Sequence, residues 1–303
     1  MLIPPNTIVL GNGQIGSGLI VPGAVILGGG KVKPDYSPID MTTEAPDPRI
    51  RYQCASSHAV YGQDGLIYFA GPDECPVEYV NGVAVGRHEP EPQRTNLVKN
   101  NTTIVTPMVG NYCTSVDSPV TTPAGTVMPL GAKYYNTNVG SGLYCRTYDP
   151  LDVNAVASGF SIVPVISRAF IERITTPDYD YINNLNVWER WVTKKTTPKT
   201  TSFSGTMSVY SDGPSIANTM TWPWGWQYEY GDTATSTILT TGTEATRGAS
   251  FLLVEMQGAR GIRVWYTSGE YDEYPANRDA WFPLPWAKKD WGVRYIPTIE
   301  YIT

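Results

Sequence analysis

Short stretches in which apolar and polar residues alternate run along much of this chain. The clearest are TWPWGWQYEY (221–230), IRVWY (262–266) and VRYIPTIEYI (293–302), with glycine and proline between such stretches. Successive side chains of a β-strand point to opposite faces, so this pattern predicts strands that bury one face. A window long enough for a regular helix is hard to find. We therefore expect an all-β protein.

The stretch 221–230 raises a question about its aromatic residues. In a strand the large rings would lie on one face, with Gln227 and Glu229 turned outward on the other. The row could be a platform on which sugar rings stack, or the core of a sandwich, or a subunit interface. Because burial of large rings is strongly stabilising, we favour core or interface. The rings are Trp222, Trp224, Trp226, Tyr228 and Tyr230.

Composition agrees with short strands and many turns. The 303 residues include 29 glycines, 25 prolines and 20 tyrosines, and the 41% of apolar residues suffices for a core. The net charge of −6, with both signs scattered, is a poor match for a phosphate backbone, so we expect no nucleic-acid partner. The apolar N-terminus lacks a positive region and contains Pro4, Pro5 and Pro22. We therefore expect no signal peptide or membrane insertion, and synthesis in the cytoplasm.

Residues that suggest chemistry are few. The segment GNGQIG, with Gly11, Gly13 and Gly16, matches the dinucleotide fingerprint. The glycines and proline that follow would break the helix that must hold the pyrophosphate. The two histidines, His58 and His88, have no recognisable nucleophile or base context.

Cysteines and acidic turns add little to the case for an enzyme. The cysteines lack zinc-site spacing and are expected to be buried free thiols: Cys54, Cys75, Cys113 and Cys145. The turns PDYDY (177–181) and GEYDEY (269–274) carry candidate carboxylate pairs, but such turns are more often solvated loops. A glycan hydrolase would need two carboxylates about 5–10 Å apart in one cleft. We expect a protein that is not an enzyme, with no cofactor and no metal site.

The first 50 residues are rich in glycine and proline yet carry many branched apolar residues. We interpret them as an extended arm that becomes ordered on a partner or on sister subunits, with a floppy leader as the alternative. The residues expected to dock are Ile8, Val9, Leu10, Ile15, Leu19, Ile20, Val25, Ile26 and Leu27.

The segment 56–97 resembles a module of bacteriophage virion proteins, notably tail fibres and other tail or head appendages. The resemblance rests on a y-x-x-D-G turn and a closing E-x-Q-R-T-N-L motif. The matching residues are Tyr61, Asp64 and Gly65, then Glu91, Gln93, Arg94, Thr95, Asn96 and Leu97. Asp64-Gly65 and Asn81-Gly82 predict two tight hairpin turns. We expect Gln93, Arg94, Thr95 and Asn96 to form a seam between this module and the next domain.

In the same proteins the module leads into a jelly roll similar to a carbohydrate-binding domain. Its signature resembles WGWQYEYG (224–231) followed by STILTTGTEATRGA (236–249). The matching residues are Trp224, Gly225, Gln227, Glu229, Gly231, Thr241, Gly242, Thr246 and Arg247. After the first motif the chain reads NLVKNNTT, where the family often has N-L-L-x-x-S-x-x-F, and nothing in the resemblance marks sugar-binding residues.

The resemblance implies an all-β virion protein in four parts. These are an N-terminal docking arm (1–50), a β-hairpin module (51–98), a jelly-roll β-sandwich (99–256) and a small C-terminal β-module (257–303). It implies a homotrimeric fibre or decoration subunit that binds other proteins of the tail or capsid. The alternative is a receptor-binding tail protein whose jelly roll recognises host surface glycan. Residues expected at a glycan site or an interface are Trp222, Trp226, Tyr228, Trp281, Trp286 and Trp291.

Overall fold

The structure is a computed structural model, and all regular structure in its described residues is β. It describes residues 33–98, 101, 113–115, 120–128, 133–136, 142–148, 154–162, 165–170, 180–181, 189–195, 204–211, 220–277 and 279–303. The all-β prediction is confirmed for these residues. The nine residues expected to dock, from Ile8 to Leu27, lie outside them.

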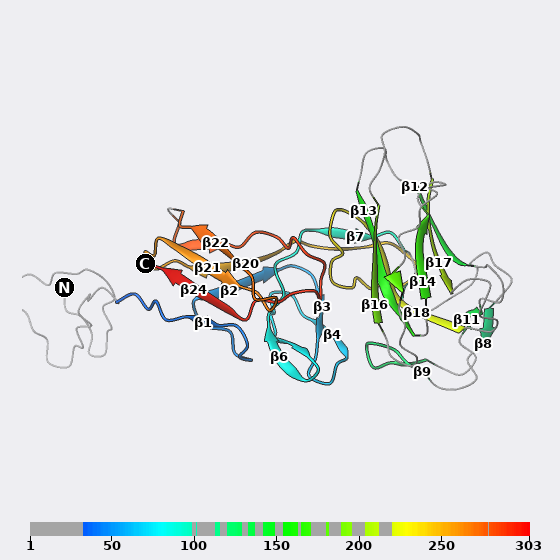
Figure 1. The fold of residues 1–303 in the computed structure, drawn as a ribbon, viewed down its shortest axis with the longest axis horizontal. Coiled ribbons are helices and arrows are strands. Elements are labelled where there is room, and N and C mark those ends of the chain that lie inside the picture. Colours follow the sequence, from blue (N-terminus) through cyan, green and yellow to red (C-terminus); the bar gives the residue numbers. More distant parts are fainter. Residues whose placement is uncertain are drawn as a thin grey trace, which may run out of the picture. The chain divides into compact units, whose positions relative to one another are not determined.

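The chain divides into two units, residues 1–36 and 37–303. Within the second unit, two small antiparallel sheets combine segments from near both ends of the sequence (Figure 1). The first has the order β1 (Ile39–Asp40), β24 (Thr298–Ile302), β21 (Gly261–Trp265) and β22 (Tyr271–Pro275). The second has the order β2 (Ile50–Cys54), β20 (Ser250–Glu255) and β23 (Trp281–Pro283).

Alternation along these strands produces the core of this body, which we call the terminal sandwich. In β20, Leu252 and Val254 point to one face and are fully buried, whereas Phe251 points to the other face and is exposed. Tyr274 and Phe282, one from each sheet, place their ring centroids 5.7 Å apart. The two sheets are therefore in contact at these rings. The other side chains that are fully buried here are Ile39, Ile262, Val264 and Ile299.

Two hairpins follow β2, and both contain the predicted turns. The first joins β3 (His58–Tyr61) to β4 (Ile67–Ala70), and Gly65 takes a φ of 79°. The second joins β5 (Glu78–Val80) to β6 (Val83–Gly86). Asn81 and Gly82, with φ of 51° and 77°, both lie in the left-handed region that a two-residue type I′ turn requires. Both turn predictions are confirmed.

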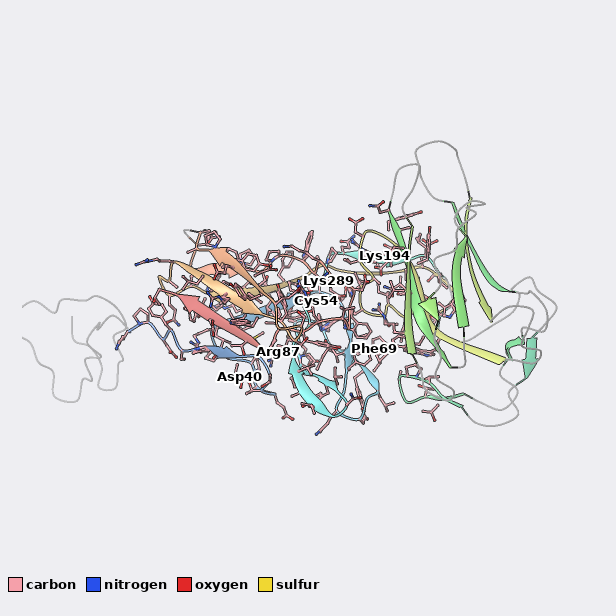
Figure 2. All side chains as sticks on the ribbon, viewed as in Figure 1. Asp40, Cys54, Phe69, Arg87, Lys194 and Lys289 are labelled. Carbon is pink, nitrogen blue, oxygen red and sulfur yellow. The ribbon has the colours of Figure 1, made fainter. Side chains whose placement is uncertain are left out.

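A buried cation holds the start of the terminal sandwich. Arg87, which is labelled in Figure 2, has no exposed surface. Its guanidinium donates to the carbonyl oxygens of Met41, Thr43 and Cys75 at 2.6–2.9 Å. Residues 41–44 are thereby fixed next to β6. Together with the pairing of Ile39 to Ile299, this places residues 37–50, which we expected in the arm, in the folded unit.

A second pair of antiparallel sheets, which we call the inserted sandwich, lies between β7 (Arg94–Asn96) and β19 (Ala245–Arg247) in the sequence. Strands β14 and β16, one from each sheet, lie in contact. The five-stranded sheet has the order β16 (Glu189–Lys195), β13 (Ala155–Ile162), β18 (Met220–Tyr230), β11 (Lys133–Asn136) and β8 (Cys113–Ser115). The four-stranded sheet has the order β12 (Gly142–Tyr148), β17 (Ser204–Ser211), β14 (Val165–Phe170) and β15 (Asp180–Tyr181). A separate hairpin joins β9 (Val120–Thr121) to β10 (Val127–Met128).

The chain leaves for the inserted sandwich and returns from it along one pair of strands. These are β7 (Arg94–Asn96) and β19 (Ala245–Arg247), which pair antiparallel and which we call the crossing pair. The pairing of β2 with β20 and of β1 with β24 joins residues from all four predicted parts of the chain. The boundaries that we expected from the sequence therefore do not coincide with limits of strand pairing.

Candidate functional site

The crossing pair brings together the two sequence motifs. Arg94 lies opposite Arg247, and Asn96 opposite Ala245, so the closing motif of the first module pairs with the T-R end of the second signature. The hydroxyls of Thr95 and Thr246 are 2.7 Å apart. Gln93 is exposed, whereas Asn96 is fully buried. Residues about 150 positions apart in the sequence thus form one local structure.

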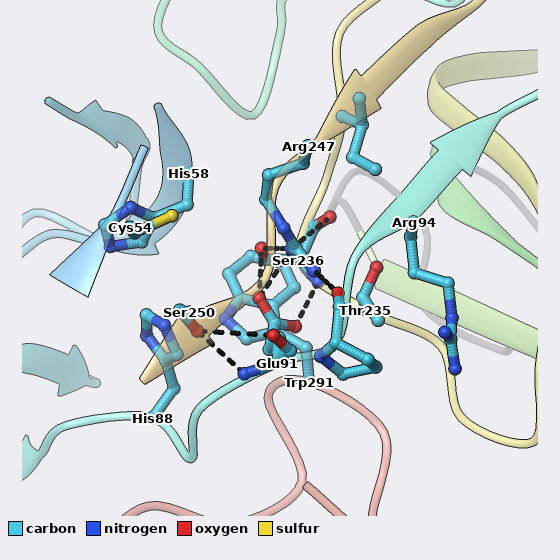
Figure 3. Close-up of polar contacts among 12 residues, drawn as sticks. Cys54, His58, His88, Glu91, Arg94, Thr235, Ser236, Arg247, Ser250 and Trp291 are labelled. Carbon is cyan, nitrogen blue, oxygen red and sulfur yellow. Dashed lines mark hydrogen bonds and ion pairs between the residues drawn. The ribbon is translucent and has the colours of Figure 1, made fainter. Parts of the chain in front are cut away.

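Glu91, which the sequence analysis did not place among the seam residues, is the centre of a buried polar cluster (Figure 3). Its carboxylate accepts hydrogen bonds from the backbone N–H and the hydroxyl of Ser236, both at 2.6 Å. It also forms an ion pair with Arg247 at 2.5 Å. Its backbone exchanges two hydrogen bonds with Ser250. Arg247 also donates to the carbonyl oxygen of Pro92 at 3.1 Å. The cluster joins the start of the crossing pair to β20 and to the loop after β18.

These contacts decide the ionisation of Glu91. Burial opposes its charge, but Arg247, His88 and the two hydrogen bonds from Ser236 together hold the pKa of this carboxyl below its ordinary value. Glu91 is therefore a carboxylate at neutral pH. Buried ions of this kind are satisfied by their partners, and removing one partner leaves an uncompensated charge.

The strand β18 is covered on both faces, which corrects our expectation for Gln227 and Glu229. Both are fully buried rather than turned outward. The Gln227 side-chain oxygen accepts from the N–H of Ile238 at 2.7 Å, and Glu229 accepts from the N–H and hydroxyl of Thr235 at 2.8 and 2.7 Å. The loop 231–240 thus folds over this face. Burial raises the pKa of Glu229, and the hydrogen bonds from Thr235 and Gln227 offset only part of that effect.

Two glycines of the second signature adopt backbone conformations that side chains disfavour. Gly225 has a φ of 65° and lies where the register of β13 with β18 shifts, between Ser158 and Phe160. Gly231 has a φ of 144°, and a Cβ atom there would lie 2.2 Å from a guanidinium nitrogen of Arg94. Arg94 also lies 3.7 Å from the carboxylate of Glu229. The glycine thus makes room for an arginine of the first motif.

The six aromatic residues that we expected at a glycan site or an interface differ in burial where the structure describes their side chains. Trp226 and Tyr228 are buried inside the chain, and Trp222 lies in β18 with its side chain outside the described residues. Trp291 is buried and stacks on Tyr61, with ring centroids 4.5 Å apart and planes 8° apart. The ring of Trp291 is therefore buried against residues of its own chain.

Trp291 joins three segments of the chain. Arg190 of β16 lies 5.0 Å from the Trp291 ring and donates to the carbonyl oxygens of Trp291 and Thr235. Trp291 packs in a core cluster with Ala59, Ile67, Phe160 and Trp224. The cluster links the first hairpin, the inserted sandwich and the segment before β24.

Trp281 and Trp286 lie on the exposed side of the sheet β2–β20–β23. Trp286 is 47% exposed, and its indole N–H donates to the carbonyl oxygen of Ser250 at 3.2 Å. The ring of Phe251, 40% exposed, lies 6.3 Å from it. The guanidinium of Arg51 lies 3.9 Å from the Trp281 ring. We call this the aromatic face.

No protein-family model matches the chain, and no curated protein matches it. Among the described residues, no three His, Cys, Asp or Glu side chains are grouped so that they could hold a metal ion. In the same part of the chain, no helix is long and apolar enough to span a membrane.

The cysteines are consistent with structural roles where they are described. Cys54 is buried, Cys75 is partly buried, and both are free thiols. Burial raises the pKa of Cys75 to about 12, so its thiol is not a nucleophile at neutral pH. Cys113 and Cys145 lie in strands whose side chains are outside the described residues.

Proposed function

We propose that this chain is a non-enzymatic structural protein of a bacteriophage virion, a fibre or decoration subunit attached to the tail or capsid by its N-terminal arm. The observation that carries the proposal is the contact between the two motifs of the resemblance. Each residue of the pair Glu91 and Arg247 belongs to a different motif, and the two are bonded directly. The motifs are therefore parts of one buried construction, which favours a structural role for them over a catalytic one.

Two finer features belong to this proposal. We assign the jelly roll to the five- and four-stranded sheets of the inserted sandwich; the assignment is supported by their antiparallel strands, which come from residues 113–230. The protein assembles as a homotrimer, and its arm binds another virion protein before or during particle assembly in the host cytoplasm. No nucleic acid, membrane or cofactor takes part.

The test is to locate the chain on intact particles by cryo-electron microscopy and to compare a variant that lacks residues 2–30. We expect density for the chain on the tail or capsid, and loss of the truncated variant from particles although it still unfolds cooperatively in solution. The exchange Trp286→Ala serves as the control and leaves incorporation unchanged. Absence of the chain from particles would contradict the proposal as a whole, and normal incorporation of the truncated chain would contradict the arm.

The alternative, a receptor-binding tail protein, is favoured by one observation, the aromatic face. Trp226 and Tyr228 are buried, so the described rings of our six candidates that can reach a glycan are Trp281 and Trp286. Exposed aromatic rings rimmed by polar side chains are typical of ligand surfaces. The double exchange Trp281→Ala and Trp286→Ala would then abolish adsorption to host cells while particles still assemble. Unchanged adsorption would contradict the receptor-binding alternative.

A further inference from the structure

The two histidines of the chain, which the proposed function does not use, lie against each other in the interior. His58 comes from β3 and His88 from the segment after β6, and their exposed fractions are 1% and 3%. Their ring centroids are 5.2 Å apart, with the planes at 70° (Figure 3). The pair therefore connects the first hairpin to the segment that leads into the crossing pair.

The carboxylate of Glu78 is bonded to His88. The Nδ1–H of His88 donates to one oxygen of Glu78 at 2.7 Å, and the other oxygen accepts the backbone N–H of Tyr61 at 2.9 Å. Glu78 has no exposed surface. His58 has no bonded carboxylate among the described residues, and its Nε2 lies 3.4 Å from the hydroxyl of Tyr52.

Titratable groups from every neighbouring element face the pair. Near neutral pH, Glu91 is a carboxylate because its pKa is lowered. Burial raises the pKa of Tyr52 and of Cys75, so both stay neutral. The groups that face the two rings are Tyr52 of β2, Glu78 of β5, Glu91 before the crossing pair and Arg247 of β19. Cys54 of β2 and Cys75 before β5 act on Tyr52.

We propose that His58 and His88 form a proton-sensitive latch. The latch holds the hairpin β3–β4 against the segment 87–91 while only His88 is charged. A second proton, on His58, places two imidazolium ions side by side in a buried site where only one of them has a bonded carboxylate. The hairpin then separates from this segment, while the inserted sandwich, which lies across the crossing pair, keeps its fold.

The environments of the two rings assign the protons in this order. Burial opposes the charge on His88, but the hydrogen bond and the charge of Glu78, with that of Glu91, raise its pKa above the ordinary 6.5. Burial, and then the charge of His88, lower the pKa of His58 to about 3. The pKa of His88 thus lies above 6.5, the ordinary value for histidine, and that of His58 lies below it.

The sign of the pH dependence follows from these two directions. His58 has a folded pKa below 6.5, so its contribution to stability is complete above pH 6.5 and is lost as the pH falls toward about 3. His88 has a raised pKa, so its contribution is complete below pH 6.5 and is lost as the pH rises through the folded value. The latch is therefore tightest near pH 6.5, where both contributions are complete, and is opened by acid.

The first test starts from the unsubstituted chain, because its two histidines give only two sets of imidazole resonances. Titration of the imidazole C–H resonances by NMR should show one ring titrating above pH 6.5 and the other close to pH 3. In the variant His88→Gln, the pKa of His58 should rise, since one charged neighbour is gone. Two rings that both titrate near 6.5, or a His58 value that does not respond to His88→Gln, would overturn the proposal.

The second test measures opening directly by hydrogen exchange of the full chain between pH 6 and pH 3.5, corrected for the intrinsic rate. In peptides from 57–61 and 86–91, the opening equilibrium should become more favourable by up to about tenfold per pH unit, the limit for one proton. The variant His58→Gln, which cannot take up that proton, should show a weaker dependence. Equal pH dependence in the two proteins would contradict the latch. If His58→Gln does not fold, the NMR titration of the unsubstituted chain decides.

Discussion

Asn96 and Asn101 donate hydrogen bonds to the same two acceptors, the carbonyl oxygens of Trp226 and Ile238, at 2.7–2.9 Å. The side-chain oxygen of Asn96 also accepts from the N–H of Tyr228, and that of Asn101 accepts from the N–H of Thr240. One asparagine belongs to the first motif and the other follows it. Together they hold β18 and the loop after it against residues 96–101 of the chain.

Because the two amides share acceptors, they should not act independently. With Asn96→Ala, the two carbonyl oxygens still receive hydrogen bonds from Asn101, and the reverse holds for Asn101→Ala. The double variant leaves both carbonyls unsatisfied, so its loss of unfolding free energy should exceed the sum of the single losses by about 1 kcal/mol or more. Urea denaturation of the four proteins measures this coupling. Additive losses would show that the shared acceptors do not matter.

The ion pair of Glu91 and Arg247 should be costly to break from one side. Glu91→Gln leaves a buried guanidinium without its carboxylate, and we expect a loss of about 3–5 kcal/mol in unfolding free energy. The matched surface pair is Arg263 and Glu273, whose side chains are 34% and 46% exposed. Glu273→Gln should leave the urea midpoint unchanged within error.

The same substitution has a consequence for acid stability. The pKa of Glu91 is lowered in the folded chain, so its contribution is complete above its ordinary value of 4.5 and is lost as the pH falls through the folded value. Glu91→Gln should therefore flatten the fall of stability below pH 4.5. An unchanged pH profile would mean that Glu91 is not ionised in the folded chain.

Gly231 and Arg94 should be coupled through space. Gly231→Ala introduces a Cβ atom at the guanidinium of Arg94 and also strains the backbone at a φ of 144°. We expect a loss of about 1–3 kcal/mol. Gly242→Ala is the control, because Gly242 has a φ of 91° but nothing within 4 Å of the added atom. The double variant Arg94→Ala, Gly231→Ala should recover part of the loss, and no recovery would argue against the contact.

Trp291 should contribute far more to stability than Trp286, although both were candidates for the same role. Trp291→Ala removes a ring packed on Tyr61 and Arg190 and opens a cavity in the core cluster, with an expected cost of about 3–5 kcal/mol. Trp286→Ala removes an exposed ring and should cost about 1 kcal/mol or less. Calorimetric unfolding of the two variants distinguishes them. Similar costs would place Trp291 outside the core.

Local features were predictable from the sequence, whereas distant pairings were not. Asp64-Gly65 and Asn81-Gly82 each specify a turn through the conformational freedom of glycine, and Gly65 and Gly82 both have positive φ. The pairing of Ile50 with Val254 depends on which of many short strands meet, and alternation alone does not decide that. The all-β class could be predicted, but the partners of the strands could not.

The sequence contained the two motifs that meet in the candidate site, but not the contacts between them. Thr95 and Asn96, which we expected in a seam, pair with Thr246 and Ala245 of the second signature. Alternation failed for Gln227 and Glu229, because it assumes that the polar face of a strand meets solvent, whereas here a loop covers that face and satisfies its hydrogen bonds. The residue pairs that close the cluster, Glu91 with Arg247 and Glu78 with His88, come from distant positions and carry no spacing signal.

The crossing pair also bears on how such a protein could diversify. The inserted sandwich begins and ends at neighbouring positions of one antiparallel ladder, with Asn96 opposite Ala245, so its two ends are separated by about 5 Å, the spacing of paired strands. A different domain whose own ends lie side by side could therefore be grafted at this point without lengthening either connection. The terminal sandwich would serve as a constant adaptor, and the domain exchanged on it as a replaceable cassette.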